Sequence, residues 1–449
     1  MKNPSITKSG FVRYLKNTSW LLGGQAGKMI VGLLLALAIA RHLGPSEFGL
    51  YSFILSLVAL VTAVTTLGAD QVARREFVRQ PDQASVLLGT CFFCTCLSSG
   101  LTFLLFLLGI LGSGMNLKHS VLYLLLGGTI LFVPFRFVDL WFQSQTRGDL
   151  STKASLFALF VFTIVKLAAL LADSSLFAFC LIYLLEILSL SLIQFGLYWA
   201  HYKVQFPWRF SLKRAKSIFG ESWPLLLSTV AISIYSHIDQ VMLKLYLGDG
   251  EVGVYAAAVK VSTIWNFFPI ILAASLFPAI VDASAAGRAL LYPRLQQYFH
   301  LNSGLAYAFV VPVAVAAPWL ISLFYGEAYS EGSAILRVHV WSTLFVFLGV
   351  ARNQHLITES FLKFSLFATV LGAVINIGLN LFWIPRYGGL GAAWATIFSY
   401  ALSAYLSSLF MKNLHAIFIM QTRSLCLIFN PLEVIRTVTS LIQPKRSNI

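Results

Sequence analysis

Two short stretches of this sequence are nearly the same: residues 43–53 read LGPSEFGLYSF, and residues 247–257 read LGDGEVGVYAA. They share leucine, glycine, glutamate, glycine and tyrosine at matching places, 204 positions apart. Glycine accepts the left-handed backbone that ends many helices, so Gly44 and Gly248 are expected at turns between helices. Asp249 has the side chain of an N-cap for the helix that follows. Two similar helix-ending stretches, here called the repeated phrase, predict a chain made of two related halves.

The composition places this chain in a membrane. Of its 449 residues, 58% are hydrophobic and only 11% are charged, and the mean hydropathy is +0.79. An ordinary soluble domain has about 25% charged residues, and so few charges would not cover the surface of a soluble fold of this length. The sequence also contains many apolar runs of about 20 residues, the length that crosses a hydrocarbon core as a helix. We therefore expect an all-α polytopic membrane protein.

The apolar runs predict twelve transmembrane helices. Continuous apolar runs favour helices over a barrel, whose strands would alternate apolar and polar residues. The expected spans are 18–40, 48–69, 86–112, 119–141, 154–172, 176–199, 223–247, 253–283, 299–325, 334–351, 361–384 and 390–411. The first of these is too long for the apolar region of a signal peptide, so we expect it to remain as a helix.

The distribution of Lys and Arg predicts the orientation of these spans. Placing the N-terminus and every even-numbered connection on one side gives that side 23 of the 32 Lys and Arg, and the other side only Arg41, Lys118 and Arg386. Positive charge accumulates on the cytoplasmic side, so both termini are expected there. The net charge of +15 then reflects membrane topology, and no nucleic-acid partner is expected.

The two copies of the repeated phrase lie six predicted helices apart, so both halves have the same orientation. This arrangement predicts parallel repeats, a layout found in secondary transporters that work by alternating access. The expected divisions are an N-lobe at 1–200, a basic cytoplasmic linker at 201–221, a C-lobe at 222–412 and a tail at 413–449. Apolar residues among basic ones in 413–442 fit a segment that lies along the cytoplasmic membrane face, and they fit a poorly ordered tail equally well.

Three stretches carry a family resemblance. ARHLGPSEFGLYSFILSLVALVTAVTTLGAD (40–70), IDQVMLKLYLGDGEVGVYAAAVKV (238–261) and IPRYGGLGAAWATIFSY (384–400) are similar to the bacterial polysaccharide flippases of the O-antigen, or Wzx, type. That superfamily also contains the lipid II flippases and the multidrug and toxin exporters, called MATE transporters. The resemblance covers about residues 11 to 412, and twelve helices in two MATE-like lobes fit it.

The resemblance implies a function. It implies a non-enzymatic flippase in the bacterial inner membrane that moves undecaprenyl-diphosphate-linked oligosaccharide to the outer leaflet for surface polysaccharide such as lipopolysaccharide. The partners it implies are this lipid-linked oligosaccharide, membrane lipids and the polysaccharide polymerase machinery, with no cofactor. No phosphate-binding loop of the Walker type occurs in the sequence, so an ion gradient is the expected energy source.

Charged residues inside the spans are the candidate functional residues, because they are costly in a membrane unless they face a polar cavity. The candidates for a cationic substrate cleft are Lys28, Lys260, Arg136 and Lys166, and those for ion coupling are Asp239, Glu186 and Asp70. Cationic residues outnumber acidic ones, which favours an anionic lipid head group over an organic cation.

Structural roles compete with these functional ones. Arg136 and Asp139, spaced i, i+3, are able to neutralise each other, and Lys166 is able to pair with Glu186 on the next helix. Lys244, near the outer end of its span, is expected to reach toward the interface. Two other functions stay open: a MATE-type exporter of small molecules, and a membrane enzyme of polysaccharide assembly. The three cysteines Cys91, Cys94 and Cys96 lack a matching ligand set, so no metal site is expected.

Overall fold

A computed structural model of the chain describes residues 8–202, 207–359 and 361–426. Every regular element in these ranges is a helix. The chain forms two compact units, Met1–Val241 and Met242–Ile449. The helices that begin in the first unit are α1 (Lys8–Thr65), α2 (Asp70–Arg79), α3 (Ala84–Gly112), α4 (Leu117–Gly127), α5 (Arg136–Ser144), α6 (Gly148–Leu171), α7 (Leu176–Tyr202) and α8 (Leu212–Leu247). Those of the second are α9 (Asp249–Thr263), α10 (Phe267–Ala285), α11 (Arg288–Tyr325), α12 (Gly332–His339), α13 (Ser342–Thr358), α14 (Leu362–Ala404) and α15 (His415–Leu425).

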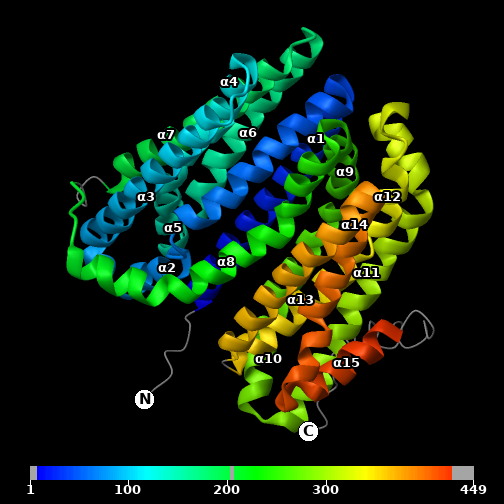
Figure 1. Ribbon diagram of the computed structural model, residues 1–449. Coiled ribbons are helices and arrows are strands. Elements are labelled where there is room, and N and C mark those ends of the chain that lie inside the picture. The colour runs from blue at the N-terminus through cyan, green and yellow to red at the C-terminus, as the bar shows by residue number, and fades with distance from the viewer. Residues whose placement is uncertain (1–7, 203–206, 360, 427–449) are drawn as a thin grey trace. The chain divides into compact units, whose positions relative to one another are not determined.

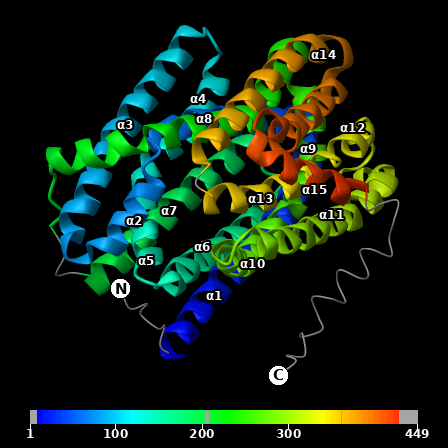
Figure 2. The ribbon, with the colours of Figure 1, turned by 90° about the horizontal axis from the view of Figure 1, so that it is seen from below.

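The first unit is a bundle around α1. Helices α3, α4, α6 and α7 lie beside α1 (Figures 1 and 2). A 3-10 helix, η2 (Gly128–Phe135), joins α4 to α5. At one end of the bundle α2, α5, α7 and the first part of α8 enclose a buried cluster of large aromatic residues, which includes Phe77, Trp141 and Tyr198. This cluster fixes α2 against α5, the two helices that carry the polar site described below.

In the second unit α13 packs against α10, α11 and α14 (Figure 2). Its largest buried cluster includes Phe299, Leu348 and Leu414. A short helix, α15, lies at the start of the expected tail, and it docks on this unit: Tyr307 Oη donates to the carbonyl of Leu425 at 2.7 Å. The remaining tail residues, 427–449, lie outside the described residues, as do 1–7 and the linker residues 203–206.

Among the described residues, ten helical segments are long and apolar enough to cross a membrane, judged by length and composition. Large apolar side chains point outward from several of them: Leu97 and Val315 are each 77% exposed and Leu171 is 90% exposed. Side chains of this kind suit a hydrocarbon environment and would be unfavourable in such numbers against water. The all-helical membrane fold predicted from composition is therefore confirmed.

Two of the ten segments contain a kink where the sequence predicts a turn between separate spans. The first kink is at Gly44 in α1 and the second is at Gly388 in α14. Each of these long helices is two helices that meet at a glycine with non-helical dihedral angles. Hydropathy and the structure therefore agree on where the chain turns, while the count of twelve spans stays a prediction.

The two glycines of the repeated phrase have the same backbone conformation. Gly44 has φ 73° and ψ 171°, and Gly248 has φ 89° and ψ −172°. Both φ values are positive, as the prediction requires, but the ψ near 180° places both glycines outside the predicted left-handed helical region, in another region that is essentially restricted to glycine. The predicted N-cap role of Asp249 is wrong. Gly248 is the N-cap of α9 and Asp249 is its first residue, so its carboxylate is free to pair with Lys244.

Candidate functional site

Two adjoining cavities lie within the first unit. The first, here called the arginine cavity, has a volume of about 780 Å³ and is lined by Arg74, Arg75, Arg79 and Arg136, together with Asp70 and residues of α8. The second, the hydroxyl cavity, has a volume of about 740 Å³. Both are lined by Thr66, Asp70, Arg136, Thr229 and Ile232, so these residues form the junction between the two cavities.

An ion pair marks the junction. Arg136 Nε lies 2.7 Å from Asp70 Oδ2, with the side chains 57% and 24% exposed. Asp70 opens α2 and Arg136 opens α5, so the carboxylate is favoured by the helix dipole of α2 and the guanidinium is opposed by that of α5. The second carboxylate oxygen of Asp70 is buried and has no hydrogen-bond partner. This arrangement leaves Arg136 accessible to a further anion.

The local pairing of Arg136 with Asp139 is not made. Asp139 instead accepts a hydrogen bond from Gln143 at 2.8 Å and another from Ser151. Because α2 packs against α5, Asp70 comes within reach of Arg136 and takes the place of the residue one helical turn away. Asp139 lines the hydroxyl cavity, where it also interacts electrostatically with the half-buried Lys28 of α1.

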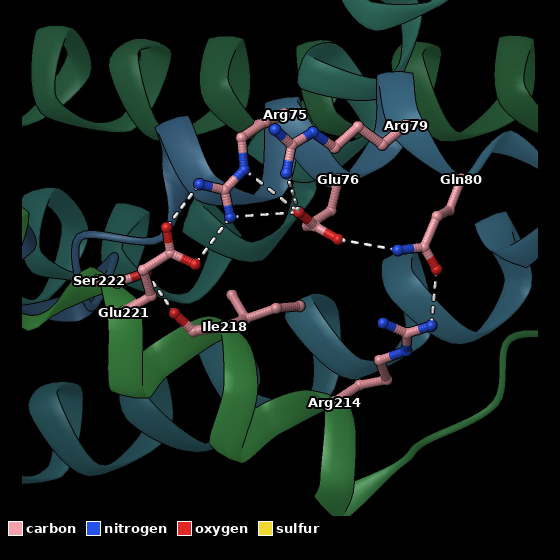
Figure 3. Close-up of polar contacts among 8 residues, drawn as sticks. All are labelled: Arg75, Glu76, Arg79, Gln80, Arg214, Ile218, Glu221 and Ser222. Carbon is pink, nitrogen blue, oxygen red and sulfur yellow. Dashed lines mark hydrogen bonds and ion pairs between the residues drawn. The ribbon is translucent and has the colours of Figure 1, made fainter.

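The arginine cavity is held together by a network between α2 and α8 (Figure 3). Arg75 forms a two-pronged bond with Glu221, with nitrogen–oxygen distances of 2.5 and 2.7 Å. Arg75 Nε also donates to Glu76 at 3.2 Å. These hydrogen bonds raise the pKa of Arg75 further above its already high range, and the bond to Glu221 has the larger effect. The charge of Arg75 is therefore permanent. Arg214 donates to Gln80 at 2.6 Å and also to Gln83.

The hydroxyl cavity has a different lining. Apart from the junction and Asp139, its polar groups are mainly hydroxyls and an amide, from Thr62, Thr129, Ser191, Gln194, Ser233 and Ser236. Aromatic rings also line it, from Phe132, Phe135 and Tyr183. Hydroxyls both donate and accept hydrogen bonds, and aromatic faces offer flat apolar surfaces. Aliphatic side chains such as Leu55, Val58 and Leu190 complete the lining, so the cavity offers hydroxyl groups set among apolar surfaces.

Only some of the predicted residues come together here. Arg136 and Asp70 line both cavities. The predicted Lys166–Glu186 pair is present, with Nζ 2.5 Å from Oε2, and these two residues line neither cavity. Lys260 is an exposed residue of α9 in the second unit.

Asp239, in α8, is 4% exposed and lies two residues after His237, which lines the hydroxyl cavity. Lys244 pairs with Asp249 across the repeated turn, and this bond explains its position near a helix end.

The sequence reading missed the arginines of α2. Arg74, Arg75 and Arg79 were counted only as cytoplasmic charges, yet they line the arginine cavity. Three arginines within six residues, directly after a predicted span, are a sequence signal for an anion-binding surface as well as for topology. Arg352 was also assigned to a connection. It is 5% exposed within α13 and donates to Ser407 at 2.7 Å.

Comparison with known proteins identifies the family. The family model described as "Polysaccharide biosynthesis protein" matches residues 14–284. The chain belongs to this family. A second model, that of the MatE family, matches residues 224–382.

Two relatives come from Haloferax volcanii. "Probable flippase AglR" is 24% identical over 404 residues, which cover 86% of this chain and 80% of that protein. "Probable low-salt glycan biosynthesis flippase Agl15" is 23% identical over 207 residues, 45% of this chain and 43% of that relative. The match therefore spans less than half the length of Agl15.

Among solved structures, the lipid II flippase MurJ in an inward closed conformation superposes with a TM-score of 0.70. The sequence identity is 13%, and the match covers 93% of this chain and 95% of that one. At this identity the likeness concerns the fold alone, and it confirms the predicted relation to the flippase and MATE transporter fold.

Proposed function

We propose that this protein is a flippase that moves an undecaprenyl-diphosphate-linked oligosaccharide across the bacterial cytoplasmic membrane, with both termini in the cytoplasm. The observation that carries the proposal is the arginine cavity, found in a chain of the polysaccharide biosynthesis family. Four guanidinium groups line it against one carboxylate, that of Asp70. A cavity of this sign attracts a diphosphate and lowers the cost of bringing it away from water.

The hydroxyl cavity supports the sugar part of the proposal. It adjoins the arginine cavity through Arg136 and Asp70, so one molecule is able to place its phosphates among the arginines and its sugars beside the hydroxyls and rings. The lipid chain then remains in the bilayer. In this proposal the two units expose the substrate alternately to the two sides of the membrane, and Lys28 and Lys260 add positive charge along its route.

A MATE-type exporter of organic cations is the second candidate. The cavity of such an exporter is expected to contain acidic groups without basic competitors, because its substrate is positively charged. The four arginines of the arginine cavity would repel an organic cation. A membrane enzyme is the third. The relatives and the structural neighbour are named as flippases, which favours transport over catalysis.

The test is transport in liposomes that contain the purified full-length protein and a lipid-linked oligosaccharide with a fluorescent sugar. Accessibility of the fluorophore to an impermeant quencher reports the leaflet in which the sugar lies. Arg136→Gln is expected to slow flipping by about tenfold or more, since a charged hydrogen bond contributes about 1.5–3 kcal/mol.

Lys118→Gln, an exposed residue outside both cavities, is the control and should flip at the wild-type rate. Equal rates for the two variants would remove the cavity from the proposal. Export of ethidium in place of flipping would favour the MATE-type function.

Coupling to an ion gradient is assigned to Asp239. A carboxylate that is 4% exposed in a membrane helix is costly unless it is neutralised, and a proton or sodium ion is able to neutralise it. Asp239→Asn is expected to abolish the dependence of flipping on the gradient while substrate binding remains. Glu186→Gln is the comparison, because it removes another carboxylate of a membrane helix, one that pairs with Lys166. Gradient-dependent flipping that persists in Asp239→Asn would leave Asp239 a structural role.

A further inference from the structure

The contact between Arg75 and Glu221 lies at the wall of the arginine cavity. Both guanidinium NH2 groups of Arg75 point at the two oxygens of Glu221, one bond each (Figure 3). Arg75 lines the cavity. A guanidinium fork binds carboxylate and phosphate with the same two-pronged geometry. Glu221 therefore occupies the face of Arg75 that a phosphate group would take.

This pair is accessible. The side chains of Arg75 and Glu221 are 39% and 51% exposed, and exposed ion pairs of this kind contribute little to stability. A diphosphate carries more negative charge than one carboxylate and offers more acceptor oxygens. An anion that enters the cavity is thus able to compete with Glu221 for Arg75.

The helix that carries Glu221 also forms part of the cavity wall. Leu225, Ser228 and Thr229 of α8 line the arginine cavity. Close behind them, Gly68 lies against α8, and a Cβ at this position would be 2.4 Å from the backbone nitrogen of Leu226. The first part of α8 therefore rests directly on the turn between α1 and α2. Two polar contacts join it to the α2 region: the Arg75–Glu221 pair, and the hydrogen bond from Arg214 to Gln80 at the end of α2.

We infer that Glu221 is a displaceable counter-anion: a phosphate group of the substrate replaces it on Arg75 and thereby removes one of the contacts between the first part of α8 and α2, which loosens this segment. The inference rests on the proposed function for the identity of the anion. It adds a regulatory step, because this contact persists until the cavity is occupied.

Binding of inorganic pyrophosphate to the detergent-solubilised full-length protein tests this inference. Glu221→Gln is expected to bind pyrophosphate about fivefold more tightly than the wild type, because an exposed competitor of Arg75 is removed. Asp82→Asn is the control, since Asp82 is an exposed acid on the 3-10 turn after α2 and its loss changes the net charge equally. Its affinity should change by less than about twofold. Arg75→Lys keeps the charge but loses the fork, and is expected to weaken binding.

Hydrogen exchange of residues 212–222 provides the second readout. In the wild type, pyrophosphate should accelerate exchange in this segment, and Glu221→Gln should show the faster exchange without pyrophosphate. Equal affinities of Glu221→Gln and Asp82→Asn would overturn the inference, as would wild-type exchange that pyrophosphate leaves unchanged. Neither readout requires transport, so failure of flipping in liposomes would count against the proposed function while leaving this competition to be judged by binding and exchange.

Discussion

Replacement of Gly44 by alanine tests whether the turn in the repeated phrase requires a glycine for its backbone conformation. Gly44 has φ 73° and ψ 171°, a region in which a residue with a Cβ is strained by about 1–3 kcal/mol. No atom lies within 4 Å of the position that its Cβ would take. The expected loss of stability therefore comes from the backbone alone and not from a steric clash with a neighbour.

Thermal unfolding followed with a thiol-reactive fluorophore measures this loss, because Cys91 and Cys180 are buried in the same unit. For a unit of this size, each kcal/mol changes the midpoint by about 2–4 °C. Gly44→Ala is thus expected to lower the unfolding midpoint by about 2–12 °C. Gly32→Ala is the matched control. Gly32 is on the same helix, it also has nothing within 4 Å of its Cβ position, and its φ is not in the positive range.

Alanine favours a helix by about 1 kcal/mol over glycine, so Gly32→Ala should raise the midpoint or leave it unchanged. Equal unfolding temperatures of Gly44→Ala and Gly32→Ala would refute the expected backbone strain at position 44. That result would mean that the turn relaxes at no cost, and the shared glycine of the two phrases would then carry no structural information.

Three further substitutions test other contacts. Lys166→Gln should destabilise the protein by about 3 kcal/mol, because it leaves the carboxylate of Glu186 without its partner; adding Glu186→Gln should restore most of the loss, and a double variant as unstable as the single one would contradict this. Arg136→Gln should weaken pyrophosphate binding by about tenfold or more; unchanged affinity would place the anion elsewhere. Glu251→Gln should accelerate hydrogen exchange at Gly389, whose N–H donates to Glu251 at 2.6 Å; exchange at the wild-type rate would show that the carboxylate charge contributes little to this bond.

Hydropathy predicted the helices well because a membrane leaves few alternatives to a helix. Its boundaries agree with the kinks at Gly44 and Gly388, since glycine is the residue that permits a sharp change of direction. Hydropathy did not predict that α8 begins at Leu212, within the expected linker. The basic residues there lowered the hydropathy, and one of them, Arg214, bonds to Gln80 at the end of α2.

The candidate site was predicted in part. The Lys166–Glu186 pair followed from opposite charges on successive helices, and it is present. The partner of Arg136 could not be predicted in this way, because the i, i+3 rule considers only residues of one helix and Asp70 belongs to another. The arginine cavity was missed for the same reason. Its charges are contributed by α2 and α5, and only their packing brings Arg75 and Arg136 to one space.

The two copies of the repeated phrase are used differently in side-chain chemistry. In the first unit His42, next to the phrase, lies 2.9 Å from the carbonyl oxygen of Ser174, at the turn between α6 and α7. In the second unit Glu251, within the phrase, accepts a hydrogen bond from the backbone N–H of Gly389, beside the kink in α14. Each copy thus contacts the last turn of its predicted half, with a different residue.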